Sequence, residues 1–222
     1  GNITSILHEL VQPAGTVVGV DSSKERLEYA RKKYGKDGIF FEARDLASPL
    51  NDLGEFDYIW VRFVLEYHLS GSFDLVSNFF NCLKPGGILC LSDLDHNPFI
   101  CYGAPPRLEM TFRRIMEELE DKHDFDPLVG RKLYSFLYDL GFEDININVE
   151  IYKTLFGKIN DIDVSNILKK IEVAPKRINF VFDEYKGGFD EFYTEAKTFF
   201  SDPRRFTYSP LVICCGTKKG LR

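Results

Sequence analysis

The stretch TVVGVDSSKERLEYARKKYG, residues 16–35, joins a short strand to a helix. Residues Thr16–Val20 are apolar and mostly β-branched, which is typical of a buried strand, and Asp21 follows them. Ser22 is a candidate N-cap, and Glu25 stands three residues later at the spacing of a capping box. The apolar face of the predicted helix, which Gly35 ends, is formed by Leu27, Ala30 and Tyr34.

The same alternation continues along the first half of the chain. Apolar runs at Ile39–Ala43, Phe56–Arg62 and Ile88–Ser92 predict three more strands, with a helix before the Lys84–Gly87 turn. The run Phe56–Arg62 is apolar on both faces, as a central parallel strand should be. Strands that alternate with helices predict right-handed crossovers and a parallel sheet covered on both faces.

The second half changes character. Helical stripes around Leu108–Leu119 and Leu133–Leu140 precede a long β-branched strand, Glu143–Tyr152, and the chain ends in a strand at Tyr208–Gly216. Residues 153–205 carry two further helical stripes rich in Phe. We therefore expect one domain from 1–152 and 206–222, with 153–205 inserted as a helical cap.

Composition excludes several classes of protein. The 222 residues carry a formal net charge of −6, which disfavours nucleic acid as a main partner. The five cysteines contain no C-x-x-C pair, and no zinc-ligand spacing is visible, so we expect no metal, small buried thiols and a cytoplasmic location. No run approaches the ~20 apolar residues of a membrane span, and no signal peptide is visible.

Carboxylates follow two of the predicted strands. Asp21 is placed to accept hydrogen bonds from the vicinal hydroxyls of a ribose, although it could equally cap the following helix. Asp45 could accept from an adenine amine while the backbone N–H of Leu46 donates to a ring nitrogen, but an ordinary turn is the alternative. Arg62 ends the third strand beside Phe63, and a buried Arg there needs an anion, either a ligand carboxylate or a neighbouring Asp.

The order of these pieces resembles the class I S-adenosylmethionine-dependent methyltransferases, in the branch of ubiquinone- and menaquinone-biosynthesis enzymes. The resemblance rests on VGVDSSKERLEYARKKYG, FDYIWVRFVLEYHL and LKPGG. It covers most of residues 1–95 and, more loosely, residues 141–216. It implies a Rossmann-like, doubly wound, mostly parallel sheet with an antiparallel last strand, and S-adenosylmethionine as cofactor. The residues that it assigns to cofactor binding are Gly1, Asp21, Ser22, Asp45, Leu46, Arg62 and Phe63.

The family's first strand and the earlier glycines of its glycine-rich loop should precede Gly1, and that strand is missing from this sequence. Because the strand is central in the family's sheet, we expect that further residues stand upstream in the complete protein. The intact mass of the natural protein tests this expectation.

The resemblance also implies in-line methyl transfer to a small organic molecule, with no base fixed by the sequence. Candidate general bases are Tyr67 and His68 after the third strand and His96 after the fourth. Asp93, Asp95 and the apolar loop around Tyr102 are candidates for the substrate pocket. The residues 153–205 would form a lid, or else a packing or homodimer face.

Two alternatives stay open at this point. A nicotinamide-dependent oxidoreductase would use Asp21 in the same way, although LKPGG and the late strand pair disfavour it. A non-catalytic module that keeps the fold could dock partners through the apolar loop at 99–106.

Overall fold

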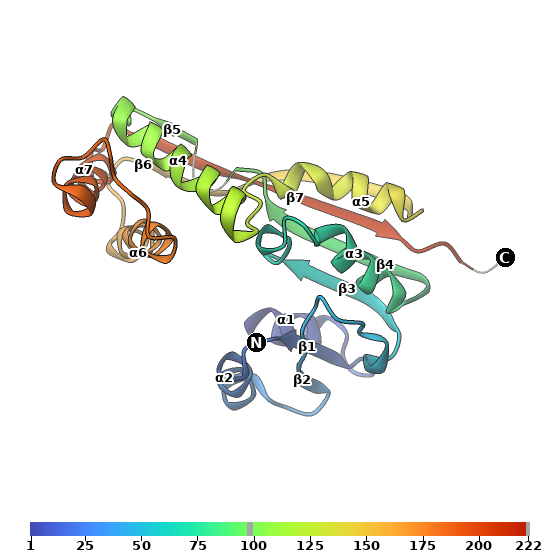
Figure 1. Cartoon of the computed structure of the whole chain (residues 1–222). Coiled ribbons are helices and arrows are strands. Elements are labelled where there is room, and N and C mark those ends of the chain that lie inside the picture. The colour runs from blue at the N-terminus through green and yellow to red at the C-terminus, as the bar shows by residue number, and fades with distance from the viewer. Residues whose placement is uncertain (97–99, 221–222) are drawn as a thin grey trace.

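The computed structural model describes residues 1–96 and 100–220, and within them a mixed α/β fold (Figure 1). The first four strands are β1 (Val17–Asp21), β2 (Ile39–Ala43), β3 (Phe56–Arg62) and β4 (Leu83–Leu94). They alternate with α1 (Asn2–Leu10), α2 (Lys24–Tyr34) and α3 (Ser72–Asn81), which confirms the predicted βα order. Short 3-10 turns lie at Asn51–Leu53 and Leu65–Tyr67.

The strands form two groups. β1 pairs with β2 in parallel, and β3 pairs with β4 in parallel. β7 (Phe206–Thr217) runs antiparallel to β4, to the short β5 (Ile100–Tyr102) and to β6 (Glu143–Phe156). The predicted antiparallel last strand is therefore confirmed, and it alone opposes the direction of its neighbours in the larger sheet.

No strand among residues 1–96 and 100–220 pairs β1 with β3. Figure 1 shows the N-terminal elements, α1 to β2, beside β3 on the side away from β4.

The core of the larger sheet lies under α3, the turn Val129–Lys132 and α5 (Leu133–Asp139). Val61, Leu89, Leu91 and Cys214 are at most 6% exposed on this face. At about 25 cal/mol per Å² of apolar surface, burial of such side chains is the main stabilising term.

A second core lies among three helices of the second half of the chain. α4 (Pro106–His123) shares a second core with α6 (Asp161–Arg177) and α7 (Gly188–Ser201), and this core is rich in Phe. Arg107 in α4 donates to Glu191 and Glu195 in α7, which joins helices almost ninety residues apart in the sequence. In Figure 1 these three helices extend from the sheet at the end opposite the C-terminus.

Candidate active site

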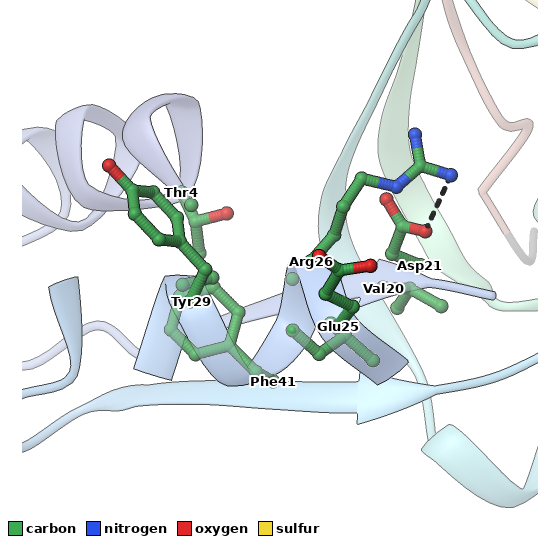
Figure 2. Close-up of a pocket in the computed structure, with 11 residues that line it drawn as sticks. Thr4, Val20, Asp21, Glu25, Arg26, Tyr29 and Phe41 are labelled. Carbon is green, nitrogen blue, oxygen red and sulfur yellow. Dashed lines mark ion pairs between the residues drawn. The ribbon is translucent and has the colours of Figure 1, made fainter. Parts of the chain in front are cut away.

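A cavity of about 500 Å³ opens between β1, β2 and the first two helices (Figure 2). Such a volume lies within the range of small-molecule sites. Its walls include Gly1 and Thr4 at the start of the chain, Gly19 and Asp21 in β1, Tyr29 in α2 and Phe41 in β2. The structure therefore brings together Gly1 and Asp21, two of the residues predicted to bind cofactor.

Asp21 ends β1 with one carboxylate oxygen still available. Its Oδ1 accepts from the backbone N–H of Ser23 at 2.8 Å and pairs with Nη2 of Arg26 at 3.2 Å (Figure 2). Its Oδ2 makes no hydrogen bond to the described residues. The side chain is about one-third exposed, so Asp21 can support the helix through Oδ1 while Oδ2 faces a ligand.

The cap of α2 differs from the prediction by one residue. Ser23, not Ser22, is the N-cap, and its hydroxyl accepts from the backbone N–H of Arg26. The reason is that Asp21 takes the N–H of Ser23 and so continues the strand one residue further. Ser22 is left exposed next to Asp21.

Gly19 shapes the wall of the cavity. A Cβ atom at this position would lie 2.8 Å from Oγ1 of Thr4 and 2.9 Å from a ring carbon of Phe41. Only glycine fits without displacing α1 or β2, and its absent side chain keeps the floor of the cavity open.

The end of β2 lies along the same edge as the end of β1. The backbone N–H of Arg44 donates to the carbonyl of Asp21 at 3.3 Å, so Asp45 is one residue from this contact. Asp45 accepts from the N–H of Ala47 at 3.0 Å, as a turn residue does. The carbonyl of Leu46 accepts from Asn78. Asp45 is exposed, and a role for it or for the Leu46 N–H in adenine binding stays a prediction.

Arg62 lies over aromatic rings rather than beside an acid. Its guanidinium is 4.5 Å from the ring centre of Phe63 and 5.4 Å from that of Tyr152 in β6. The two rings meet edge to face at 5.1 Å. No carboxylate among residues 1–96 and 100–220 forms an ion pair with Arg62. Of the two anionic partners considered from the sequence, the neighbouring Asp is therefore not observed.

The predicted bases do not form one cluster. Tyr67 packs on Phe125, and burial, with a hydrogen bond to Glu66, raises the pKa of Tyr67 to about 12. His68 lies within electrostatic reach of Asp124. Burial lowers the pKa of His96, whose buried Nδ1 has no hydrogen-bond partner among residues 1–96 and 100–220.

The two predicted substrate residues have different environments. Asp95 accepts from the Nε and Nη2 atoms of Arg131 at 2.8 and 3.2 Å, and from its backbone N–H at 2.9 Å. Tyr102 is 75% exposed on β5. Asp95 is thus occupied by a protein partner, while Tyr102 is free to contact a ligand at the surface.

Two buried acids lie between the ends of β3 and β4, and sequence reasoning named only Asp93 of the two. Asp93 is 1% exposed and accepts from the backbone N–H groups of Leu65 and Leu94, while Glu66 is 5% exposed. Burial and the nearby charge of Glu66 raise the pKa of Asp93 to about 7. Asp93 was a candidate for the substrate pocket only because it follows a predicted strand. No sequence pattern indicated that Glu66 is buried, because its burial depends on the turn after β3.

Two negative findings apply to the residues that the structure describes. None of their helices is long and apolar enough to cross a membrane. Among these same residues, no group of three or more His, Cys, Asp or Glu side chains could hold a metal ion.

Comparison with known proteins identifies the N-terminal part of the chain. Residues 1–91 match the family model described as a methyltransferase domain. Juvenile hormone acid O-methyltransferase of Bombyx mori is 29% identical over 192 residues, which are 82% of this chain and 66% of that protein. Demethylmenaquinone methyltransferase of Lactococcus lactis is 29% identical over 120 residues, or 52% of this chain and 46% of that protein.

A further relative is an uncharacterized 37.1 kDa protein in transposon TN4556 of Streptomyces fradiae, 30% identical over 64% of this chain and 40% of its own length. The chain therefore spans between 40% and 66% of the length of these three relatives.

Solved structures show the same fold. A proposed methyltransferase of Bacillus halodurans superposes with a TM-score of 0.56 at 16% identity, over 99% of this chain and 100% of that one. The [4+2]-cyclase SpnF superposes with a TM-score of 0.50 at 16% identity, over 97% and 71%. The fold is thus Rossmann-like, and residues 1–91 are similar to a methyltransferase domain. The resemblance to the class I S-adenosylmethionine-dependent methyltransferases is confirmed.

Proposed function

We propose that the protein transfers a methyl group from S-adenosylmethionine to a small organic molecule. The observation that carries this proposal is Asp21, which ends β1 inside the methyltransferase domain with Oδ2 free beside a 500 Å³ cavity. A carboxylate in this position can accept hydrogen bonds from both hydroxyls of a ribose.

The residues around the cavity fit the adenosyl part of that cofactor. Asp21 would accept from the ribose, beside Ser22, while Gly19 leaves room for the sugar above β1. Asp45 and the N–H of Leu46 would meet the adenine further along the same edge. Gly1, at the N-terminus of α1, would let the backbone approach the ligand closely.

When bound, S-adenosylmethionine supplies a methyl group that its sulfonium has already activated. The protein therefore has to align the acceptor with that methyl group and exclude water. We propose that the cap, residues 153–205 together with α4, covers the acceptor, and that Asp95 and Tyr102 lie on its approach. Tyr67, His68 and His96 remain the candidates for accepting a proton.

The same proposal includes the partners and the location of the protein. The methyltransferase domain implies a small-molecule acceptor. The net charge of −6 supports the absence of a nucleic-acid partner, and a homodimer stays a prediction. The cysteines, which form no disulfide within the described residues, support a reducing, cytoplasmic environment.

Calorimetry tests the proposal directly. S-adenosylhomocysteine should bind to the complete wild-type protein, whereas NAD should not. Label from methyl-tritiated S-adenosylmethionine should pass to an acceptor in a small-molecule extract. Binding of NAD alone would favour the oxidoreductase alternative. Cofactor binding without any transfer would favour a different use of the fold, because a shared fold does not fix the reaction.

A further inference from the structure

Three hydrogen-bond donors without protein acceptors gather on one face of the larger sheet. Trp60 and Arg62 stand two residues apart in β3, so their side chains leave the same face. Ser92 in β4 is the register partner of Arg62 and shares that face. The buried Nε1 of Trp60 and Oγ of Ser92 have no hydrogen-bond partner, and Arg62 has no ion pair among the described residues.

Aromatic rings hold the guanidinium of Arg62 above this face. Phe63 and Tyr152 contact it at 4.5 and 5.4 Å and contact each other at 5.1 Å. Rings fix the plane of a guanidinium but accept none of its N–H groups in the way a carboxylate does. Arg62 is only half-buried, so a ligand can still reach these groups.

The acid nearest to Tyr152 along β6 is hydrogen-bonded to a residue other than Arg62. Glu150 stands two residues before Tyr152, and its Oε1 accepts from Nδ2 of Asn148 at 2.6 Å. A buried hydrogen-bond donor without an acceptor costs free energy of folding, and a buried guanidinium costs more because it is charged. An anionic ligand would offset this cost better than a neutral one.

The direction of the Arg62 side chain indicates whether this anionic ligand is the cofactor or another molecule. β4 and β7 lie between β3 and β6, so Tyr152 stands on a strand roughly 14 Å from β3 at the usual ~4.8 Å spacing. For the guanidinium and the ring of Tyr152 to meet, the side chain of Arg62 must lean across β4 toward β6. β1, which ends at Asp21, lies on the other side of β3 (Figure 1). Arg62 therefore points away from the adenosyl pocket.

We propose that Arg62, framed by Phe63 and Tyr152, binds a carboxylate of the methyl acceptor. The inference rests on the proposed function, because only a methyltransferase has a methyl acceptor. It changes the role of Arg62 from cofactor binding to substrate recognition. It identifies the substrate class as organic acids whose apolar part contacts the aromatic rings beside the guanidinium.

The first test compares acids with matched neutral amides. Benzoate, cinnamate and dodecanoate are titrated against benzamide, cinnamamide and dodecanamide in the presence of S-adenosylhomocysteine. At least one acid should bind the wild type tenfold or more tightly than its amide. Arg62→Met should abolish this preference and Arg62→Lys should keep part of it. Arg113→Met, which removes an exposed arginine of α4, is the matched control and should leave the preference unchanged.

The second test separates the acceptor from the cofactor as the source of the carboxylate. S-adenosylhomocysteine carries a carboxylate and 5′-methylthioadenosine does not. Arg62→Met should leave both affinities within twofold of wild type. A tenfold loss for S-adenosylhomocysteine alone would show that the cofactor supplies the anion, and would overturn the proposal.

Equal binding of every acid and its amide by the folded wild type would overturn the proposal as well, as would an Arg62→Met variant that keeps the preference. Failure of the proposed function looks different, because the wild type would then not bind S-adenosylhomocysteine at all. Circular dichroism of each variant confirms that it is folded.

Discussion

Asp95, directly after β4, accepts three hydrogen bonds from Arg131, two from the guanidinium at 2.8 and 3.2 Å and one from the backbone N–H at 2.9 Å. The pair fastens the end of β4 to the turn that precedes α5. Asp95 therefore has a structural partner, whatever it contributes to substrate binding.

This pair predicts unequal effects for its two members. Asp95→Ala removes all three hydrogen bonds, whereas Arg131→Met keeps the backbone donor and removes only a half-exposed side chain. We expect Asp95→Ala to lower the free energy of unfolding by about 1–2 kcal/mol, and Arg131→Met to lower it by less than about 1 kcal/mol. Urea denaturation measures both. Equal losses would mean that the backbone hydrogen bond contributes nothing.

The strands were the part of the fold that the sequence predicted best. Ile39–Ala43 and Phe56–Arg62 were predicted with the observed bounds, because an apolar run between polar turns has few alternatives. The N-cap was displaced by one residue, since Asp21 and two serines compete for the same N–H groups. β6 extends to Phe156, beyond the predicted Tyr152, because its far half pairs with β7 across an irregularity near Ile151.

The candidate site was harder to predict from the sequence than the strands, because its contacts join segments that are distant in the sequence. Position alone placed Asp21 at a strand end, but only the structure shows that Oδ1 is used and Oδ2 is not. The contact of Arg62 with Tyr152 spans ninety residues of sequence, and no local pattern announces it. The cap helices were recognised as helices, whereas the inclusion of α4 in their core required tertiary packing.

Asp93 should make stability depend on pH. Its pKa rises from an ordinary value of 3.8 to about 7, mainly through burial and then through the charge of Glu66. Between pH 4 and 7 the unfolded chain releases this proton while the folded chain keeps it. Stability from this group is therefore complete below pH 4 and falls by up to about 1.4 kcal/mol per pH unit until pH 7.

Glu66→Gln isolates this contribution. The variant removes the like charge, so the pKa of Asp93 should fall and the loss of stability with rising pH should become smaller. Chemical denaturation at pH 5 and pH 8 measures the difference for each protein. A variant whose pH dependence matches that of wild type would exclude Glu66 as a cause.

Asp21→Asn should weaken S-adenosylhomocysteine binding by roughly ten- to a hundredfold, because a hydrogen bond to a charged group contributes about 1.5–3 kcal/mol. The amide still accepts from Ser23, so α2 should stay capped. Arg26→Met is the control, since it removes the ion pair with Oδ1 and leaves Oδ2 in place. Calorimetry that finds equal affinities for Asp21→Asn and wild type would remove Asp21 from the cofactor site.

Arg107 should determine how firmly α7 is held against α4. Its guanidinium donates to Glu195 and Glu191 and lies 4.3 Å above the ring of Tyr185, whose hydroxyl donates to Glu195 at 2.6 Å. Because one side chain joins all three partners, Arg107→Met should increase the hydrogen-exchange rate of the α7 amides. The increase should be larger than that caused by removing an isolated surface ion pair.

Lys122→Met supplies that comparison, since the ion pair that Lys122 forms within the described residues is with Glu118, one turn away in the same helix. We expect Lys122→Met to change the free energy of unfolding by less than about 0.5 kcal/mol and to leave exchange in α7 unaltered. For Arg107→Met, faster exchange should be confined to residues 188–201, with the sheet amides unchanged. If the sheet amides accelerated to the same extent, the cap and the sheet would unfold as one cooperative unit, and Arg107 would contribute to global stability rather than to the docking of α7.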